Sequence, residues 1–142
     1  MDLIFEPFVG LGPLKFGLSK SEVESMQLQS FGSGDYNYQG EKLSAFSIYP
    51  SDAVYPIVIS GEDILKMDRL SAALHLADQS ADYGQAQGGS LYFIDLGCAI
   101  LQYESPSREF LFFDREYDTG EPLRDMTPNS IESYYEDNVW DA

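Results

Sequence analysis

Few side chains in this sequence are of the types that catalyse reactions near neutral pH. Such chemistry usually draws on a histidine, a reactive cysteine or a metal cage, and the 142 residues include one histidine, His75, and one cysteine, Cys98. Cys98 stands in the apolar run 96–101, which predicts a buried and unreactive thiol. No second metal ligand or nucleophile is spaced to meet His75. The residue types therefore predict a binding protein and not an enzyme, with no cofactor and no metal.

Carboxylates are the one abundant group that could supply other chemistry. Acids alternate from Asp114 onward and Gly120 follows them, a pattern slightly similar to a calcium-binding loop, but the ligand spacing that such a loop requires is absent. Hydrolysis of a glycosidic bond requires two carboxylates that face each other across a cleft, and no pair is marked by its spacing. A small carboxylate hydrolase is therefore kept only as an alternative.

The glycine-rich stretch 9–17 invites comparison with a phosphate-binding loop. Lys15 is not followed by serine or threonine, and Pro13 lacks the amide hydrogen that would contact a phosphate. The acidic surroundings also oppose an anion. We therefore interpret these glycines as turns that lead tightly into a helix.

The charge balance indicates the class of partner. The chain has 24 Asp and Glu against 8 Lys and Arg, a formal net charge of −16. Nucleic acids and anionic membranes are bound through Lys and Arg, so we expect neither as a direct partner. A strongly negative surface instead favours a basic macromolecule. Residues 104–142 carry 11 acids and 3 arginines, so the density of negative charge is highest in that segment.

Acids interleaved with tyrosines are the predicted partner-binding residues. Carboxylates steer a basic partner toward the surface, and tyrosines supply contact area. The predicted residues lie in a late loop, in the C-terminal tail and in an earlier patch: Asp114, Glu116, Tyr117, Asp118 and Glu121; Tyr134, Tyr135, Glu136 and Asp137; and Asp35, Tyr36 and Tyr38. The alternative interpretation of the tail is a solvated segment that contacts no partner.

Two helices are predicted with clear starting points. Ser19 and Glu22 form a capping-box pattern, which predicts a helix over 20–28. Asp68 is the expected N-cap of a second helix over 69–79. Residues at helical spacing form one apolar stripe on that helix: Leu70, Ala73, Leu74 and Ala77.

Strand patterns occupy most of the intervening sequence. Residues 42–49 alternate in polarity and 54–60 are rich in β-branched residues, so these two runs are expected to pair as a hairpin. Further strands are predicted at 90–94, 97–103 and 109–114. The last of these is nearly all apolar, as expected of a strand that is buried on both faces.

These elements predict a single α+β domain over 1–142, in which an antiparallel sheet carries two or three helices on one face. The third helix is expected at 129–137. The halves 10–60 and 61–114 show the same order of helix, glycine-containing loop and strand at an offset of about 48 or 49 residues. This order is compatible with two tandem helix-plus-hairpin repeats, although residue identity between the halves is poor. Residues 115–142 then form an acidic C-terminal segment.

Signals for export and for membrane insertion are absent from the sequence. Residues 1–7 have no basic region followed by an apolar run, as a signal peptide would. No window approaches the ~20 apolar residues of a membrane span. One cysteine excludes an internal disulfide. We therefore expect a cytoplasmic protein.

Three short motifs resemble known bacterial families. Residues 10–23, GLGPLKFGLSKSEV, look like the opening of a group of small immunity proteins encoded beside polymorphic and contact-dependent toxins, and 61–64 and 92–97 are similar to the same group. The core of the first motif is also similar to the helix entry of small lipoproteins of outer-membrane protein assembly, which in turn resemble the tandem α/β repeat of a β-lactamase inhibitor protein. The lipobox cysteine of such lipoproteins is absent here.

The resemblance implies an immunity protein that binds and neutralises one cognate toxin domain. The acidic charge favours a basic toxin that attacks nucleic acid, because opposite charge speeds association while aromatic anchors slow dissociation. One alternative is an acidic nucleic-acid mimic or regulatory adaptor that is not tied to a toxin. The carboxylate hydrolase named above is the other.

Overall fold

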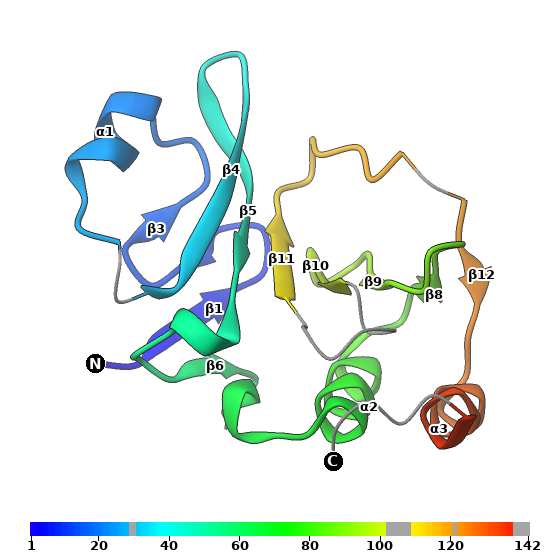
Figure 1. Ribbon diagram of the computed structural model, residues 1–142. Coiled ribbons are helices and arrows are strands. Elements are labelled where there is room, and N and C mark those ends of the chain that lie inside the picture. The colour runs from blue at the N-terminus through cyan, green and yellow to red at the C-terminus, as the bar shows by residue number, and fades with distance from the viewer. Residues whose placement is uncertain (29–30, 102–108, 121, 138–142) are drawn as a thin grey trace.

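The computed structural model describes residues 1–28, 31–101, 109–120 and 122–137. Within them the chain has an α+β fold, with three α-helices and two sheets that consist mostly of antiparallel strands (Figure 1). This class is the one that the sequence predicts. No helix in the described part of the chain is both long and apolar enough to cross a membrane.

The larger sheet is antiparallel and has seven strands in the order β12-β8-β9-β10-β11-β5-β4. Its right-hand half in Figure 1 is a meander in which β8, β9, β10 and β11 follow one another, and the β4–β5 hairpin joins this meander through β11. The strands are β4 (Ser33–Gln39), β5 (Lys42–Ile48), β8 (Tyr83–Gln85), β9 (Leu91–Phe93), β10 (Cys98–Leu101), β11 (Glu109–Phe113) and β12 (Arg124–Asp125).

The smaller sheet contains the one parallel pair described. Its five short strands have the order β3-β2-β1-β6-β7, and β1 runs parallel to β6. The strands are β1 (Leu3–Glu6), β2 (Gly10–Leu11), β3 (Leu14–Lys15), β6 (Ile57–Ile59) and β7 (Glu62–Asp63).

The prediction that residues 42–49 and 54–60 pair as a hairpin is wrong. The 3-10 turn η2 (Pro50–Asp52) turns the chain away from β5, and β6 pairs with β1 instead, with Leu3 opposite Ile57. β5 lies between β4 and β11. Both runs contain strands as predicted, but the local pattern of side chains does not determine which strand each of them pairs with.

Helix α1 (Lys20–Ser25) begins at the predicted capping box. The Ser19 amide donates to Glu22 Oε1 at 3.1 Å, and the Glu22 amide donates to Ser19 Oγ at 3.2 Å. The first of these bonds lowers the pKa of Glu22, because it stabilises the carboxylate. The helix ends at Ser25 rather than at residue 28, because Met26 is already extended.

Ser19→Ala is expected to lower the free energy of unfolding by about 1 kcal/mol, because it leaves helical amides without their cap. Urea denaturation at neutral pH measures the change. Ser71→Ala, at an exposed serine inside the second helix, α2 (Arg69–Gln79), is the matched control and should change stability little. An equal effect of the two substitutions would show that the capping box contributes nothing.

Helix α2 (Arg69–Gln79) has the predicted N-cap, since the Ser71 amide donates to Asp68 Oδ1 at 2.7 Å. The buried face of α2 is rotated about the helix axis relative to the predicted stripe, because Leu70 and Leu74 are only half-buried. The buried residues of the helix are Arg69, Ala72, Ala73, Leu76 and Ala77. His75 Nε2 lies 2.8 Å from the carbonyl oxygen of Ile59, so this histidine ties α2 to β6.

Helix α3 (Pro128–Asp137) confirms the third predicted helix. Thr127 caps it, because the Ser130 amide donates to Thr127 Oγ1 at 3.2 Å. Helices α2 and α3 pack side by side on one face of the larger sheet (Figure 1). Ile131 and Tyr135 of α3 belong to the main core.

The main core lies between the two sheets and the helices. Leu3 and Leu11 of the smaller sheet, Phe46 of β5 and Leu76 of α2 are all buried in it. Phe112 of β11 joins these layers. The chain also repeats one order of elements, hairpin, helix and hairpin, first as β1–β2, α1 and β4–β5 and then as β6–β7, α2 and β8–β9.

Candidate partner-binding surface

The larger sheet has a second apolar face on the side opposite α2 and α3. Successive residues of a strand point to opposite faces, so Phe110 and Phe112 face the main core while Leu111 and Phe113 face outward. Four of the five residues of β11 are buried and Leu111 is half-buried, so the strand is largely buried on both faces. Other members of the outer cluster come from β5, β9 and β10 and from the residue after β8: Ala45, Tyr92, Ala99, Leu101 and Ala86.

Small side chains make this outer face hollow. Leu111 is paired with Ser47 on one side and with Ala99 on the other, and Ala99 is paired with Tyr92. In this row of paired residues across the strands, the small side chains of Ser47 and Ala99 alternate with the larger ones of Leu111 and Tyr92, which leaves space above the sheet. The hollow therefore follows from residue size and strand register.

The segment that follows β11 crosses this outer face before it reaches β12 (Figure 1). Two turns shape it: Asp114 Oδ1 accepts from the Glu116 amide at 3.0 Å, and Asp118 Oδ1 accepts from the Gly120 amide at 2.8 Å. Tyr117, between the two turns, packs against the outer cluster, with its ring centroid 5.6 Å from that of Phe113. The acids of this loop thus also fix the position of Tyr117.

Two adjoining hollows share Tyr117 in their walls, and we call their lining residues the outer surface. One hollow, of about 240 Å³, has polar and aromatic walls that include Asp35, Tyr36, Asn37, Ser47, Tyr92, Glu109 and Tyr117. The other, of about 440 Å³, is lined by Phe8, Ile94, Asp95, Phe113, Asp114, Arg115, Tyr117, Asp118 and Thr119. Parts of the chain that are distant in sequence therefore form one continuous surface.

Five of the predicted binding residues line the outer surface, although they come from two separate patches of the sequence: Asp35, Tyr36, Asp114, Tyr117 and Asp118. Glu116 is exposed on the same loop. Tyr38 lines a different groove, of about 550 Å³, between α1 and β4, and Asp35 and Tyr36 line this groove as well. The side chain of Tyr36 packs against the main core. Glu121 lies outside the described residues.

The predicted tail residues lie on α3, which packs on the other face of the sheet. Tyr134 is half-buried and Glu136 is exposed. Tyr135 is only 7% exposed and is part of the main core, so it differs from the exposed anchor that the sequence led us to expect. Its position on the apolar side of α3 explains the burial. Asp137 ends the helix, and its side chain lies outside the described part.

Among the acids and tyrosines of the outer surface, three were not predicted: Tyr92, Asp95 and Glu109. Glu109 is the most informative of them. It is the one charged residue of the strand sequence EFLFF and is only 9% exposed. A charge at the start of a run that is otherwise apolar was the signal that could have marked it, because buried charges are rare without a partner.

Asp35 has a hydrogen-bonded position at the edge of the outer surface. The hydroxyl of Tyr49 donates to Asp35 Oδ2 at 2.9 Å. This bond raises the pKa of Tyr49, and the negative charges of Glu109 and Asp35 act in the same direction. Tyr49 packs directly over Gly34, where a Cβ atom would lie 2.0 Å from the ring. Glycine at position 34 therefore allows the contact that orients Asp35.

Asp95 holds the turn between α2 and β8. Ser80 Oγ donates to one carboxylate oxygen, and the Ala81 amide donates to the other at 2.7 Å. Partial burial acts to raise the pKa of Asp95, but these hydrogen bonds together outweigh it and lower the pKa below its usual value of 3.8.

Asp95→Asn is expected to destabilise the fold by about 1 kcal/mol at pH 7. Because the folded-state pKa of Asp95 is lowered, its carboxylate contributes stability above about pH 4, and this contribution is lost as the pH falls through the folded-state value. Urea denaturation of both proteins at pH 7 and pH 3 measures this. Their difference in stability should shrink at pH 3, and a constant difference would contradict the role of the charge.

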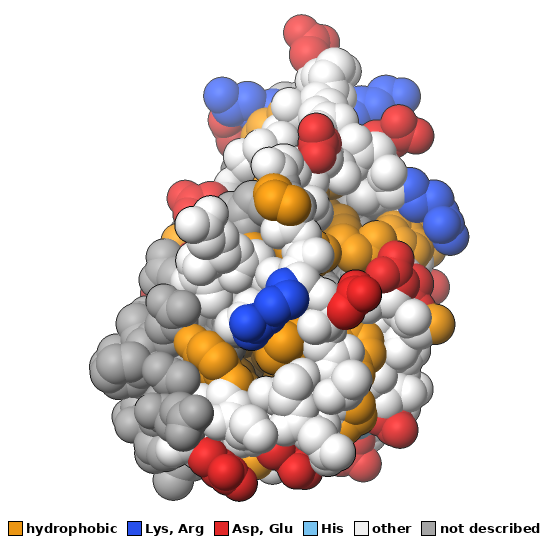
Figure 2. All heavy atoms as spheres, turned by 90° about the vertical axis from the view of Figure 1, so that its right-hand side faces the viewer, with side chains coloured by type: hydrophobic (Ala, Val, Ile, Leu, Met, Phe, Trp, Pro, Cys, Tyr) orange, Lys and Arg blue, Asp and Glu red, His pale blue; other side chains and the backbone are white. Residues whose placement is uncertain are grey.

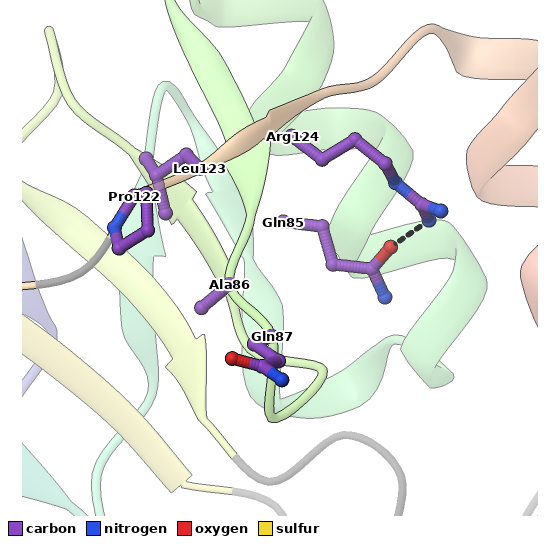
Figure 3. Close-up of a pocket in the computed structure, with 6 residues that line it drawn as sticks. All are labelled: Gln85, Ala86, Gln87, Pro122, Leu123 and Arg124. Carbon is purple, nitrogen blue, oxygen red and sulfur yellow. Dashed lines mark hydrogen bonds between the residues drawn. The ribbon is translucent and has the colours of Figure 1, made fainter.

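A third hollow, of about 520 Å³, lies at the β8–β12 edge and differs in chemistry. Figure 3 shows Gln85 and Arg124 pointing toward each other there, with Arg124 Nη2 donating to Gln85 Oε1. Its described walls include this cation and no carboxylate. It is therefore less suited to a basic partner than the outer surface.

Exposed acidic residues come from all parts of the described sequence and not only from the C-terminal part. Figure 2 shows one face on which acidic side chains lie above and below a band that includes hydrophobic side chains. The ion pairs Lys15–Glu6, at 3.8 Å, and Lys20–Glu24, at 4.0 Å, are both exposed. Such pairs contribute little, so most of the negative charge is left to act on a partner.

The next question is whether Cys98 or a group of metal-binding side chains could support catalysis. Burial strongly raises the pKa of the Cys98 thiol, which opposes a role as nucleophile. Within the described ranges, no three His, Cys, Asp or Glu side chains are grouped as a metal site would require. Comparison of the chain with protein-family models, with curated proteins and with solved structures finds no match.

Proposed function

We propose that this chain is a cytoplasmic immunity protein, which binds a basic toxin domain through the outer surface and thereby neutralises it. The observation that carries the proposal is the meeting of Asp35 with Asp114, Tyr117 and Asp118 around adjoining hollows. Tyrosines beside carboxylates are the combination that anchors and steers a cationic protein.

Three further features support the proposal. The net charge of −16 raises the association rate with a partner of opposite charge. The outer surface is built on a rigid sheet and on a loop held by its own turns, so little ordering is required on binding. The motif at residues 10–23 resembles immunity proteins encoded beside toxins.

The decisive experiment is co-purification of this chain with the product of the neighbouring gene, at low salt and then at rising salt. We expect a complex whose affinity falls as salt screens the opposite charges. The complex should also abolish the activity of the toxin. Absence of a complex at low salt with every neighbouring toxin candidate would overturn the proposal, and an affinity indifferent to salt would remove its electrostatic part.

A further inference from the structure

Glu109 presents an unusual carboxylate to the smaller hollow of the outer surface. The residue is 9% exposed, and its Oε2 atom is fully buried with no hydrogen-bond partner among the described residues. Burial of a carboxylate is costly where the lost hydration is not replaced, and none of the described residues replaces it at Glu109 Oε2. A cation that entered the hollow would offset that cost.

The hollow already has the composition of a cation site. Glu109 and Asp35 both line it, and no Lys or Arg is among its described lining residues. Asn37 and Ser47 add neutral polar groups to the wall. The space is therefore negative, polar at its walls and about 240 Å³ in volume, enough for the end of one side chain.

Aromatic rings form the other part of the wall. Tyr92 and Tyr117 both line the hollow, and Phe113 lies between them, with ring centroids 6.4 Å from Tyr92 and 5.6 Å from Tyr117. Tyrosine rings attract cations through their negatively polarised faces. Arginine uses both features, because its planar guanidinium pairs with carboxylates, stacks on rings and is less strongly hydrated than an ammonium.

We infer that this hollow binds the guanidinium group of an arginine side chain presented by the protein partner, with Glu109 as the principal charge contact and Asp35 as the second. The inference rests on the proposed function for the source of the arginine. The site itself is a property of this chain and is testable without the toxin.

The test is a titration of the full chain with N-acetyl-arginine amide, followed by amide chemical shifts in two-dimensional NMR. N-acetyl-citrulline amide is the neutral control of nearly the same shape, and N-acetyl-lysine amide is the ammonium control. We expect weak binding of the arginine compound, with a Kd on the order of 1 mM. The shifts should be centred on Ser47, Tyr92, Glu109 and Leu111. The lysine compound should bind more weakly and the citrulline compound should not bind.

Glu109→Gln keeps the shape of the side chain and removes its charge. It should weaken binding of the arginine compound at least about tenfold, whereas Glu62→Gln, an exposed position on β7, has the same change in charge and should leave binding unchanged. Glu109→Gln should also unfold at the same or a higher urea concentration than the wild-type protein, because it removes a buried charge whose Oε2 atom has no hydrogen-bond partner among the described residues. Asp35→Asn, at an exposed residue, provides a second variant that does not disturb the core.

Equal shifts with arginine and citrulline compounds, or an unchanged affinity in Glu109→Gln, would overturn the inference. A toxin complex that forms equally well with wild-type protein and Glu109→Gln would also overturn it, while leaving the immunity function intact. Conversely, a specific arginine site in a protein that captures no toxin would overturn the proposed function alone.

Discussion

Phe112→Ala is expected to lower the free energy of unfolding by about 3–5 kcal/mol, the usual range for deleting a buried phenylalanine ring. Phe112 is fully buried, and its ring centroid lies 4.8 Å from that of Phe5 and 5.6 Å from that of Phe46. Because Phe5 belongs to the smaller sheet and Phe46 to the larger one, this ring fills the space between the two sheets. Its removal leaves a cavity at the contact that holds them together.

Urea denaturation followed by circular dichroism measures this loss. A total stability of about 5–15 kcal/mol is usual for a domain, so the variant should show a greatly lowered midpoint or be partly unfolded in buffer. Phe112→Leu, which keeps most of the apolar volume, should cost clearly less. A loss below about 1 kcal/mol for Phe112→Ala would show that the two sheets do not share their core at this ring.

Tyr117→Ala is expected to weaken the complex with the proposed toxin by about 2 kcal/mol or more, which is about thirtyfold in Kd. Tyr117 lines both hollows of the outer surface, and aromatic residues at the centre of an interface carry much of its binding energy. Calorimetry or surface plasmon resonance with the purified toxin domain measures the change. Most of it should appear in the dissociation rate, because Tyr117 is an uncharged anchor.

Tyr134→Ala is the matched control, because Tyr134 is a half-buried tyrosine of α3, on the other face of the larger sheet. It should leave the affinity unchanged if the outer surface binds the partner. The reverse result, a large loss for Tyr134→Ala and none for Tyr117→Ala, would place the interface on α3. Thermal unfolding of both variants separates loss of binding from loss of folding.

The predicted helices were found because their signals are local. The Ser19–Glu22 capping box and the Asp68 cap lie within one turn of the amides that they serve, so neighbouring residues are enough to predict the start of a helix. The face that α2 buries was predicted less well. Ala72 and Leu76 are buried there while Leu70 and Leu74 are half-buried, because the packing of the helix against the sheet and α3 sets its rotation.

The binding surface was predicted in its parts and not as a whole. Asp35 and Tyr117 were each predicted, but their position around one hollow depends on β4–β5 pairing with β11 and on the loop crossing the outer face. Tyr135 illustrates the opposite case. Tyr135 is a tyrosine with acidic neighbours, like the other candidates, yet its side chain is buried in the main core.

By itself the sequence determined the α+β class, the helix starts, the strand at 109–114 and the excess of negative charge, since each depends on composition or on residues close together in the chain. Only the tertiary structure decided that β6 pairs with β1 and that Glu109 lies buried at the hollow that Asp35 also lines. It also decided that Tyr92, Phe113 and Tyr117 come together. The reason is that strand partners and the covering of a sheet face depend on contacts between distant residues, whose energies no local pattern of side chains expresses.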